Sequence, residues 1–262
     1  MIRIEKVAVV FGASGGLGEA TVVRVAQDYN VVVGYYRGES KAQKLVDGIT
    51  KAGRKATALQ VDMKDSESVR QFFMSAKQVW GRLDCIISAT GPPITLGPLA
   101  EASPDHFKRV VETDIIGSFN IIKHGVPVLE PAAAATAGSD GSFPSILLFL
   151  TCAVQKTLDW DGLSFIPKMG VVGIVKQAAR ELGPKGIRVN GLAPGTINAG
   201  IVFDSFAADK YGAAVLENQG TQTPMGRRGE AHEIAEVAAF LVSPKASYVS
   251  GQIIGVDGGF SA

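Results

Sequence analysis

A glycine-rich turn near the start of the chain has the composition of a phosphate-binding loop. Gly12, Gly16 and Gly18 stand in the segment GASGGLG, which follows an apolar run and leads into an amphipathic stretch. Glycines let the chain turn sharply and let backbone amides approach a pyrophosphate at the positive end of a helix. The pattern therefore predicts a dinucleotide site. Its expected contacts in this turn are Gly12, Ser14, Gly15, Gly16, Leu17 and Gly18.

Short apolar runs alternate with amphipathic stretches along the whole chain. Their near-continuous hydrophobicity is typical of strands buried on both faces of a parallel sheet. Strands are expected at residues 7–11, 31–36, 56–61, 85–89, 146–150, 187–192 and 252–256. Helices are expected at residues 19–29, 41–52, 66–80, 104–129, 167–182 and 230–242. This alternation predicts a single doubly wound α/β Rossmann domain over residues 1–262, with about seven parallel strands.

Local signals refine these elements. Ser103 followed by Pro104 predicts a helix start, and Gly183-Pro184 predicts a helix end. The small, polar stretch of residues 132–142 is expected to be a flexible surface insertion. Residues 198–224 are too many for a simple connection, so a lid or a helical excursion is expected there.

The composition indicates a protein that binds small molecules. Hydrophobic residues make up 46% of the chain and charged residues 19%, which predicts a large core rather than disorder. Lys plus Arg (26) nearly equals Asp plus Glu (25), so the sequence has no broad basic field for nucleic acid or a membrane surface. Two cysteines, far apart, and three scattered histidines predict neither a disulfide framework nor a metal site. We expect a cytoplasmic protein.

The spacing of Gly12, Gly16 and Gly18 resembles that of the short-chain dehydrogenase/reductase family. Asp62 after the third strand, Asn190 in an RVN segment and the GQIIGVDGG run near the end are similar to the same family, so the resemblance covers essentially the whole chain. It implies a homo-oligomer, a dimer or tetramer. It also implies further cofactor contacts at Asp62, Met63, Ala89, Thr90, Gly91, Lys168, Pro194, Gly195 and Ile197.

The end of the second strand predicts which dinucleotide is bound. NAD-preferring members of the family place an acidic residue there to bind the ribose hydroxyls. Here the strand ends in Tyr36-Arg37, which offers a phosphate a guanidinium and no competing carboxylate at position 36. We therefore expect NADP(H), with Tyr36 and Arg37 beside the phosphorylated ribose.

The acid–base residues depart from the family pattern. The resemblance implies a serine, a tyrosine and a lysine, the last two as YxxxK, and an asparagine from the central helix. Here Lys168 is kept, Ser164 replaces the tyrosine and Asp114 replaces the asparagine. The family's serine aligns with Thr151 or Cys152, depending on loop length. A serine hydroxyl is a far weaker acid than a phenol of pKa about 10, so Ser164 is not expected to replace the tyrosine as proton donor.

Three hypotheses follow from these substitutions. In the first, another acid serves carbonyl reduction, and Asp159 or Asp161 would do so if an apolar neighbour raised its pKa. In the second, the substrate is an imine or iminium ion, which needs no proton on the product heteroatom; Asp114, Asp159 or Asp161 would stabilise the cation. The missing tyrosine resembles relatives in fungal alkaloid pathways that reduce an iminium and shape a cycloaddition. In the third, the chain is a repurposed non-redox enzyme, such as a cyclase, or an inactive NADP-binding scaffold or regulator.

Overall fold

Seven parallel strands form one sheet in the order β3-β2-β1-β4-β5-β6-β7. The computed structural model describes residues 5–136, 143–200 and 210–262. The strands are β1 (Val7–Phe11), β2 (Asn30–Tyr35), β3 (Ala56–Gln60), β4 (Cys85–Ser88), β5 (Ser145–Phe149), β6 (Arg188–Pro194) and β7 (Ile253–Val256). The strand order reverses between β1 and β4, so the segments that follow these two strands diverge. Such a switch point opens a crevice at the carboxyl ends of the strands.

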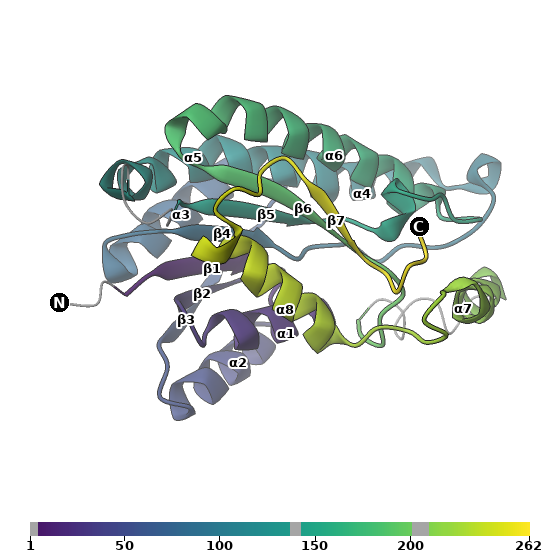
Figure 1. Ribbon diagram of the computed structural model, residues 1–262, viewed down its shortest axis with the longest axis horizontal. Coiled ribbons are helices and arrows are strands. Elements are labelled where there is room, and N and C mark those ends of the chain that lie inside the picture. The colour runs from purple at the N-terminus through teal and green to yellow at the C-terminus, as the bar shows by residue number, and fades with distance from the viewer. Residues whose placement is uncertain (1–4, 137–142, 201–209) are drawn as a thin grey trace.

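Helices cover both faces of this sheet, as Figure 1 shows. They are α1 (Gly16–Val25), α2 (Glu39–Lys51), α3 (Ser66–Trp80), α4 (Pro104–Val111), α5 (Gly117–Thr136), α6 (Gly162–Leu182), α7 (Lys210–Gln222) and α8 (Ala231–Val242). One apolar core lies between the sheet and α3, α5 and α6. A second core lies under α1, α2 and α8. The predicted doubly wound α/β fold is therefore confirmed.

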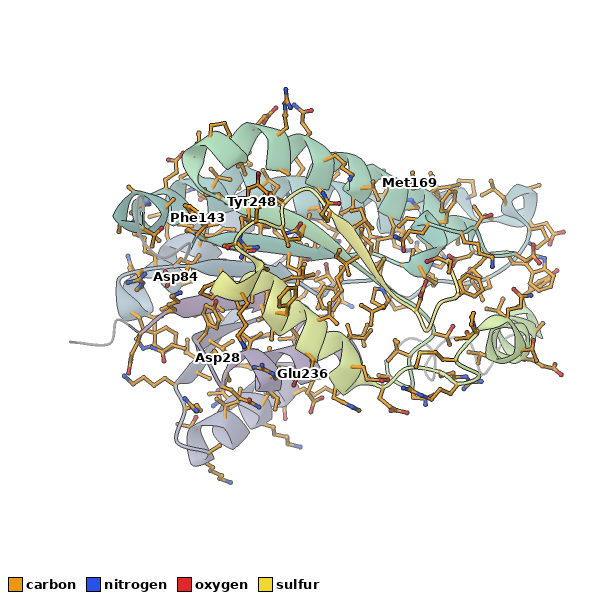
Figure 2. All side chains as sticks on the ribbon, viewed as in Figure 1. Asp28, Asp84, Phe143, Met169, Glu236 and Tyr248 are labelled. Carbon is orange, nitrogen blue, oxygen red and sulfur yellow. The ribbon has the colours of Figure 1, made fainter. Side chains whose placement is uncertain are left out.

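Polar contacts fix some of these helices at their ends and edges. Arg24 of α1 donates hydrogen bonds to Glu236 of α8 and to Asp28, and Figure 2 labels both carboxylates. Ser103 accepts a hydrogen bond from the backbone N–H of His106 and caps α4, with Pro104 in its first turn. Helix α6 ends at Leu182, directly before Gly183-Pro184. Both predicted helix boundaries are confirmed.

Two predicted boundaries are wrong by five residues or more, and α1 at Gly16–Val25 also lies earlier than the helix predicted at 19–29. Helix α6 begins at Gly162 rather than at Pro167, because a proline within the first two turns costs only one backbone hydrogen bond and the apolar face continues toward the amino end. The expected insertion at residues 132–142 is in part helical, since α5 runs on to Thr136 and buries Ala132 and Ala133. The rest of it, residues 137–142, lies outside the described residues.

The central helix departs from regular α-helix where it passes the crevice. Between α4 and α5, residues Glu112–Ile116 form a π-helical turn that buries Asp114. Single π turns of this kind are frequent at functional sites because the wider turn changes the direction of a side chain. Within the described chain, no helix combines the length and the apolar character needed to cross a membrane.

Candidate active site

A cleft of about 550 Å³ opens at the carboxyl ends of the strands, where the switch point places it. The predicted site residues that line it are Ser14, Gly15, Gly16, Leu17, Ala89, Thr90, Gly91, Asp114, Thr151, Cys152, Asp161, Ser164, Lys168, Pro194, Gly195 and Ile197. The predicted residues outside its lining are Gly12, Gly18, Tyr36, Arg37, Asp62, Met63 and Asp159. The fold thus gathers residues from the ends of several strands and helices, far apart in the sequence, into one site.

The glycine-rich turn has the backbone shape that its sequence predicts. Gly12 has φ +72°, and a Cβ at this position would lie 2.8 Å from the carbonyl oxygen of Ala89. A Cβ on Gly18 would collide with the backbone of Gly12. Helix α1 begins at Gly16. The turn therefore presents bare backbone at a helix amino terminus, which is the arrangement that binds a pyrophosphate.

A cationic surface lies at the end of β2. The Tyr36 ring is 45% exposed, with the Arg37 guanidinium 5.1 Å and the Lys64 ammonium 5.8 Å from its centroid. Asp62 accepts a hydrogen bond from the backbone N–H of Lys64. The Met63 side chain is buried in the core. Sequence reasoning missed Lys64, because it follows the third strand and only the fold brings it beside Tyr36.

Lys168 is buried and all three of its ammonium donors have acceptors. It donates to Asp114 Oδ1 at 3.1 Å and to the backbone carbonyls of Thr90 and Phe149, both at 3.1 Å. A lysine ammonium has three hydrogens, so these contacts saturate it. Burial raises the pKa of Asp114, and the neighbouring ammonium lowers it. Two residues that the sequence placed separately in the site therefore form one buried ion pair.

Asp161 is a buried carboxylate of the site that forms no ion pair within the described chain. It is 5% exposed, and its Oδ2 has no hydrogen-bond partner among the described residues. Burial raises the pKa of Asp161 to about 7, while a hydrogen bond from Ser164 lowers it. Asp161 is also the N-cap residue of α6, yet its side chain makes no capping hydrogen bond. Asp159, the other loop candidate, is exposed and lies outside the cleft lining.

Thr151 and Cys152 both line the cleft, at the end of β5. The Thr151 hydroxyl accepts a hydrogen bond from the backbone N–H of Ala153 at 3.3 Å. Burial raises the pKa of the Cys152 thiol to about 12, so the thiol is neutral at ordinary pH. Thiolate chemistry is therefore not favoured at this position.

One wall of the cleft is apolar and was missed from the sequence. Ile94 and Leu96, from the segment after β4, pack with Val110 of α4 and Val215 of α7. The other apolar members of the lining include Pro92, Pro93, Phe149, Leu150 and Leu158. Of the residues in this wall, only Pro92-Pro93 has a sequence pattern that indicates irregular backbone. Helix α7 lies within the long connection at 198–224, of which residues 201–209 are outside the described residues.

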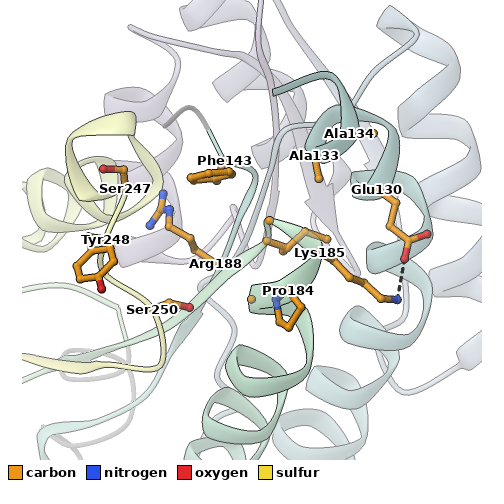
Figure 3. Close-up of a pocket in the computed structure, with 13 residues that line it drawn as sticks. Glu130, Ala133, Ala134, Phe143, Pro184, Lys185, Arg188, Ser247, Tyr248 and Ser250 are labelled. Atoms are coloured by element: carbon orange, nitrogen blue, oxygen red, sulfur yellow. Dashed lines mark hydrogen bonds and ion pairs between the residues drawn. The ribbon is translucent and has the colours of Figure 1, made fainter. Parts of the chain in front are cut away.

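A second cavity, of about 590 Å³, opens at the amino ends of the strands (Figure 3). Arg188 lies in its lining, and its guanidinium donates to the carbonyls of Leu241 and Ser243 at the end of α8. The carboxyl end of a helix favours a cation at this place, although the Arg188 Nε has no hydrogen-bond partner among the described residues. None of the predicted site residues lines this cavity, so the cleft remains the candidate active site.

The fold and the cleft define a doubly wound Rossmann protein with a dinucleotide-type crevice. A family model described as enoyl-(acyl carrier protein) reductase matches residues 12–261. A 3-oxoacyl-(acyl-carrier-protein) reductase, FabG, of Staphylococcus aureus is 31% identical over 262 residues, which cover 98% of this chain and 99% of the relative. An uncharacterized oxidoreductase of Methylorubrum extorquens is 32% identical over 261 residues, 99% of each chain.

Solved structures agree with this assignment. A short-chain dehydrogenase/reductase from Serratia marcescens superposes with a TM-score of 0.84 at 27% identity, over 98% of each chain. A 3-ketoacyl-(acyl-carrier-protein) reductase from Brucella melitensis, complexed with NADH, gives a TM-score of 0.86 at 26% identity, again over 98% of each chain. The chain belongs to the short-chain dehydrogenase/reductase family of oxidoreductases.

Proposed function

We propose that this protein is an NADP(H)-dependent reductase with a non-standard active site, in which Asp161 faces the heteroatom of the substrate. The substrate is an imine, an iminium ion or an activated carbonyl compound. The observation that carries the proposal is the buried Asp161 carboxyl, which lines the cleft with one oxygen unpartnered among the described residues. Buried polar groups normally have hydrogen-bond partners. Because this oxygen is buried, a turn of the side chain toward the cleft would let a bound substrate supply the missing partner.

The turn after β1 and the surface after β2 fit the proposed cofactor. A Cβ on Gly12 would lie 2.8 Å from the Ala89 carbonyl oxygen and one on Gly16 would lie 2.7 Å from the Gly200 backbone nitrogen, so these glycines let the neighbouring chain pack closely around the turn at the start of α1, where a pyrophosphate would bind. The relative from Brucella melitensis, described with NADH, supports a nicotinamide cofactor. Arg37 and Lys64 beside Tyr36 favour the phosphorylated ribose of NADP(H). When bound, NADPH supplies a hydride.

The preference for NADP(H) is testable at Arg37. We expect Arg37→Ala to weaken NADPH binding about 10- to 100-fold, because a hydrogen bond to a charged group contributes about 1.5–3 kcal/mol. NADH has no 2′-phosphate, so its affinity is expected to change less than about twofold, the scale of a lost surface contact. Fluorescence titration of both nucleotides measures this. Equal losses of affinity for NADPH and for NADH would contradict the preference for NADP(H).

Asp161 departs from what its position in the chain favours. An aspartate at an N-cap normally accepts a hydrogen bond from a backbone N–H, which stabilises a helix by about 1 kcal/mol. Here the side chain gives up that contact, and its unpartnered Oδ2 is buried beside the cleft. Local rules of this kind are broken mainly at functional sites. A role toward a ligand explains why the unfavourable arrangement is kept.

Asp114 and Lys168 have a different role. The ammonium of Lys168 neutralises Asp114, so Asp114 is not available to a substrate cation. The contact of Lys168 with a cofactor ribose stays a prediction, and it requires a ribose hydroxyl to replace one of the two carbonyl acceptors. The ion pair joins the π turn of the central helix to the ends of β4 and β5. It therefore holds the floor of the cleft in place.

The pH dependence of the rate separates the two substrate classes. Since burial raises the pKa of Asp161 to about 7, its carboxyl is mostly protonated at pH 6 and mostly ionised at pH 8. Carbonyl reduction needs the proton, so its rate should fall as the pH rises through about 7. Reduction of a permanently charged iminium uses the carboxylate, so its rate should rise over the same range. Steady-state NADPH oxidation from pH 5.5 to 8.5 checks both directions. A flat profile for both would contradict the role of Asp161.

A further inference from the structure

We propose that Trp160 is a positioning residue, which holds the Asp161 carboxyl in the cleft through a contact with α7. This inference rests on the proposed function of Asp161. The set of contacts that carries it joins three segments: the stretch after β4, the loop before α6, and α7. We call it the Trp160 clasp, and its members are Gly97, Trp160 and Tyr211.

The backbone at Trp160 is in an unfavourable conformation. Its φ is +62°. Among the described residues, no other non-glycine residue has a positive φ. For a bulky residue this left-handed conformation is an outlier that the surroundings must enforce. Asp161 follows with φ −92° and ψ 20°, in the sparsely populated bridge region. These two successive conformations turn the chain sharply into α6.

Two contacts hold that conformation. The backbone N–H of Gly97 donates to the Trp160 carbonyl at 3.0 Å. The Trp160 ring lies against the Tyr211 ring of α7, with centroids 5.1 Å apart and an interplanar angle of 52°. Tyr211 also packs over Gly97, where a Cβ would lie 3.7 Å from its ring. The clasp thus fixes the residue directly before Asp161 from both sides.

The clasp also packs against the apolar wall of the cleft. Trp160 and Tyr211 pack against the apolar wall formed by Ile94, Leu96 and Val215. Burial is the main cause of the raised pKa of Asp161. Loosening the contact with α7 would admit water, and water favours the ionised carboxylate. The position of α7 should therefore set the protonation of Asp161.

Other charged groups of the cleft do not account for such an effect. Asp114 and Lys168 neutralise each other, and the Cys152 thiol is neutral at ordinary pH. Glu19 and Lys41 also line the cleft, as neighbours of the glycine-rich turn. Ser164 contributes the hydrogen bond that lowers the pKa of Asp161. Burial therefore remains as the cause of the raised pKa of Asp161, and we infer that the clasp contributes to it through the apolar wall.

Tryptophan fluorescence tests the inference without a substrate. The chain has two tryptophans, so Trp80→Phe leaves Trp160 as the single emitter. In this background we expect the emission to titrate with a midpoint near the Asp161 pKa of about 7, and the transition to vanish in Asp161→Asn. Tyr211→Leu should lower the midpoint by about one unit, the scale of a moderate environmental shift. Tyr211→Phe, which keeps the ring contact, should leave it near the original value.

The outcomes are distinct from those that test the proposed function. An absent transition in the Trp80→Phe background, or an unchanged midpoint in Tyr211→Leu, would overturn the inference. Trp160→Gly gives a second test, because glycine relieves the positive φ. A bystander tryptophan would then leave turnover unchanged, whereas the clasp predicts a loss of about tenfold with the fold intact by circular dichroism. If Asp161→Asn keeps full activity, it is the proposed function that fails.

Discussion

Replacing Asp161 by asparagine is expected to lower kcat about 10²- to 10⁴-fold, the usual contribution of a positioned proton-transfer group. The substitution keeps the size of the side chain but removes both its acidic proton and its negative charge. The kcat for carbonyl substrates and the kcat for iminium substrates should therefore both fall. NADPH affinity should change little, because Asp161, at the N-cap of α6, is not among the expected cofactor contacts. Steady-state kinetics and an NADPH titration measure the two effects.

Asp159 offers a matched comparison two residues away. Both aspartates lie in the same loop and both are sequence-based candidates, but Asp159 is exposed and outside the cleft lining. The same Asp→Asn change there should alter kcat less than about twofold, as expected for a surface substitution. Similar losses in the two variants would show that the loop matters as a whole. That outcome would remove the special role given to Asp161.

Removing the cation of the buried ion pair should be the most destabilising single change at the site. Lys168→Met leaves Asp114 buried without its partner, and breaking such a pair typically costs about 3–5 kcal/mol of the free energy of unfolding. For a chain of this size the melting temperature should fall by roughly 10 °C. Differential scanning calorimetry measures it. A change below about 1 kcal/mol would mean that the pair is not buried in solution.

The pH dependence of the stability of the Lys168→Met variant follows from the direction in which burial shifts the pKa of Asp114. Burial raises the pKa of this carboxyl, and the ammonium that opposes the rise is gone in the variant. The folded state then binds the proton more tightly than the unfolded state, so stability is lost as the pH rises above the unfolded pKa. The variant should melt higher at pH 5 than at pH 8. Adding Asp114→Asn removes the buried charge and should recover part of the lost stability.

Most of the fold was predictable from local patterns. Seven buried apolar runs separated by amphipathic stretches define a doubly wound sheet, and the glycine-rich turn identifies its first crossover. The errors arose where tertiary packing overrode local signals. Pro167 suggests a helix start, but the buried face of α6 extends five positions further toward the amino end. The small residues after Pro131 suggest a loop, but Ala132 and Ala133 pack into the core.

The sequence predicted most of the residues that line the candidate site, but not which of them form an ion pair. The sequence identified Asp114 and Lys168 from their positions in a family pattern, and Asp161 as a loop carboxylate whose pKa an apolar neighbour could raise. It did not show that two of them neutralise each other, because that contact depends on the π turn and on the ends of β4 and β5. Nor did it separate Asp161 from Asp159, since burial depends on how the loop is turned at Trp160. The apolar wall from α7 needed the three-dimensional arrangement.

The most direct test of the central claim is NADPH oxidation by the purified protein against matched pairs of cyclic imines and ketones, followed by loss of cofactor absorbance. We expect turnover of at least one member of a pair, and the class that reacts, together with its pH profile, identifies the role of Asp161. Tight NADPH binding with no oxidation against either class would contradict the reductase assignment. It would favour the repurposed, non-redox alternative.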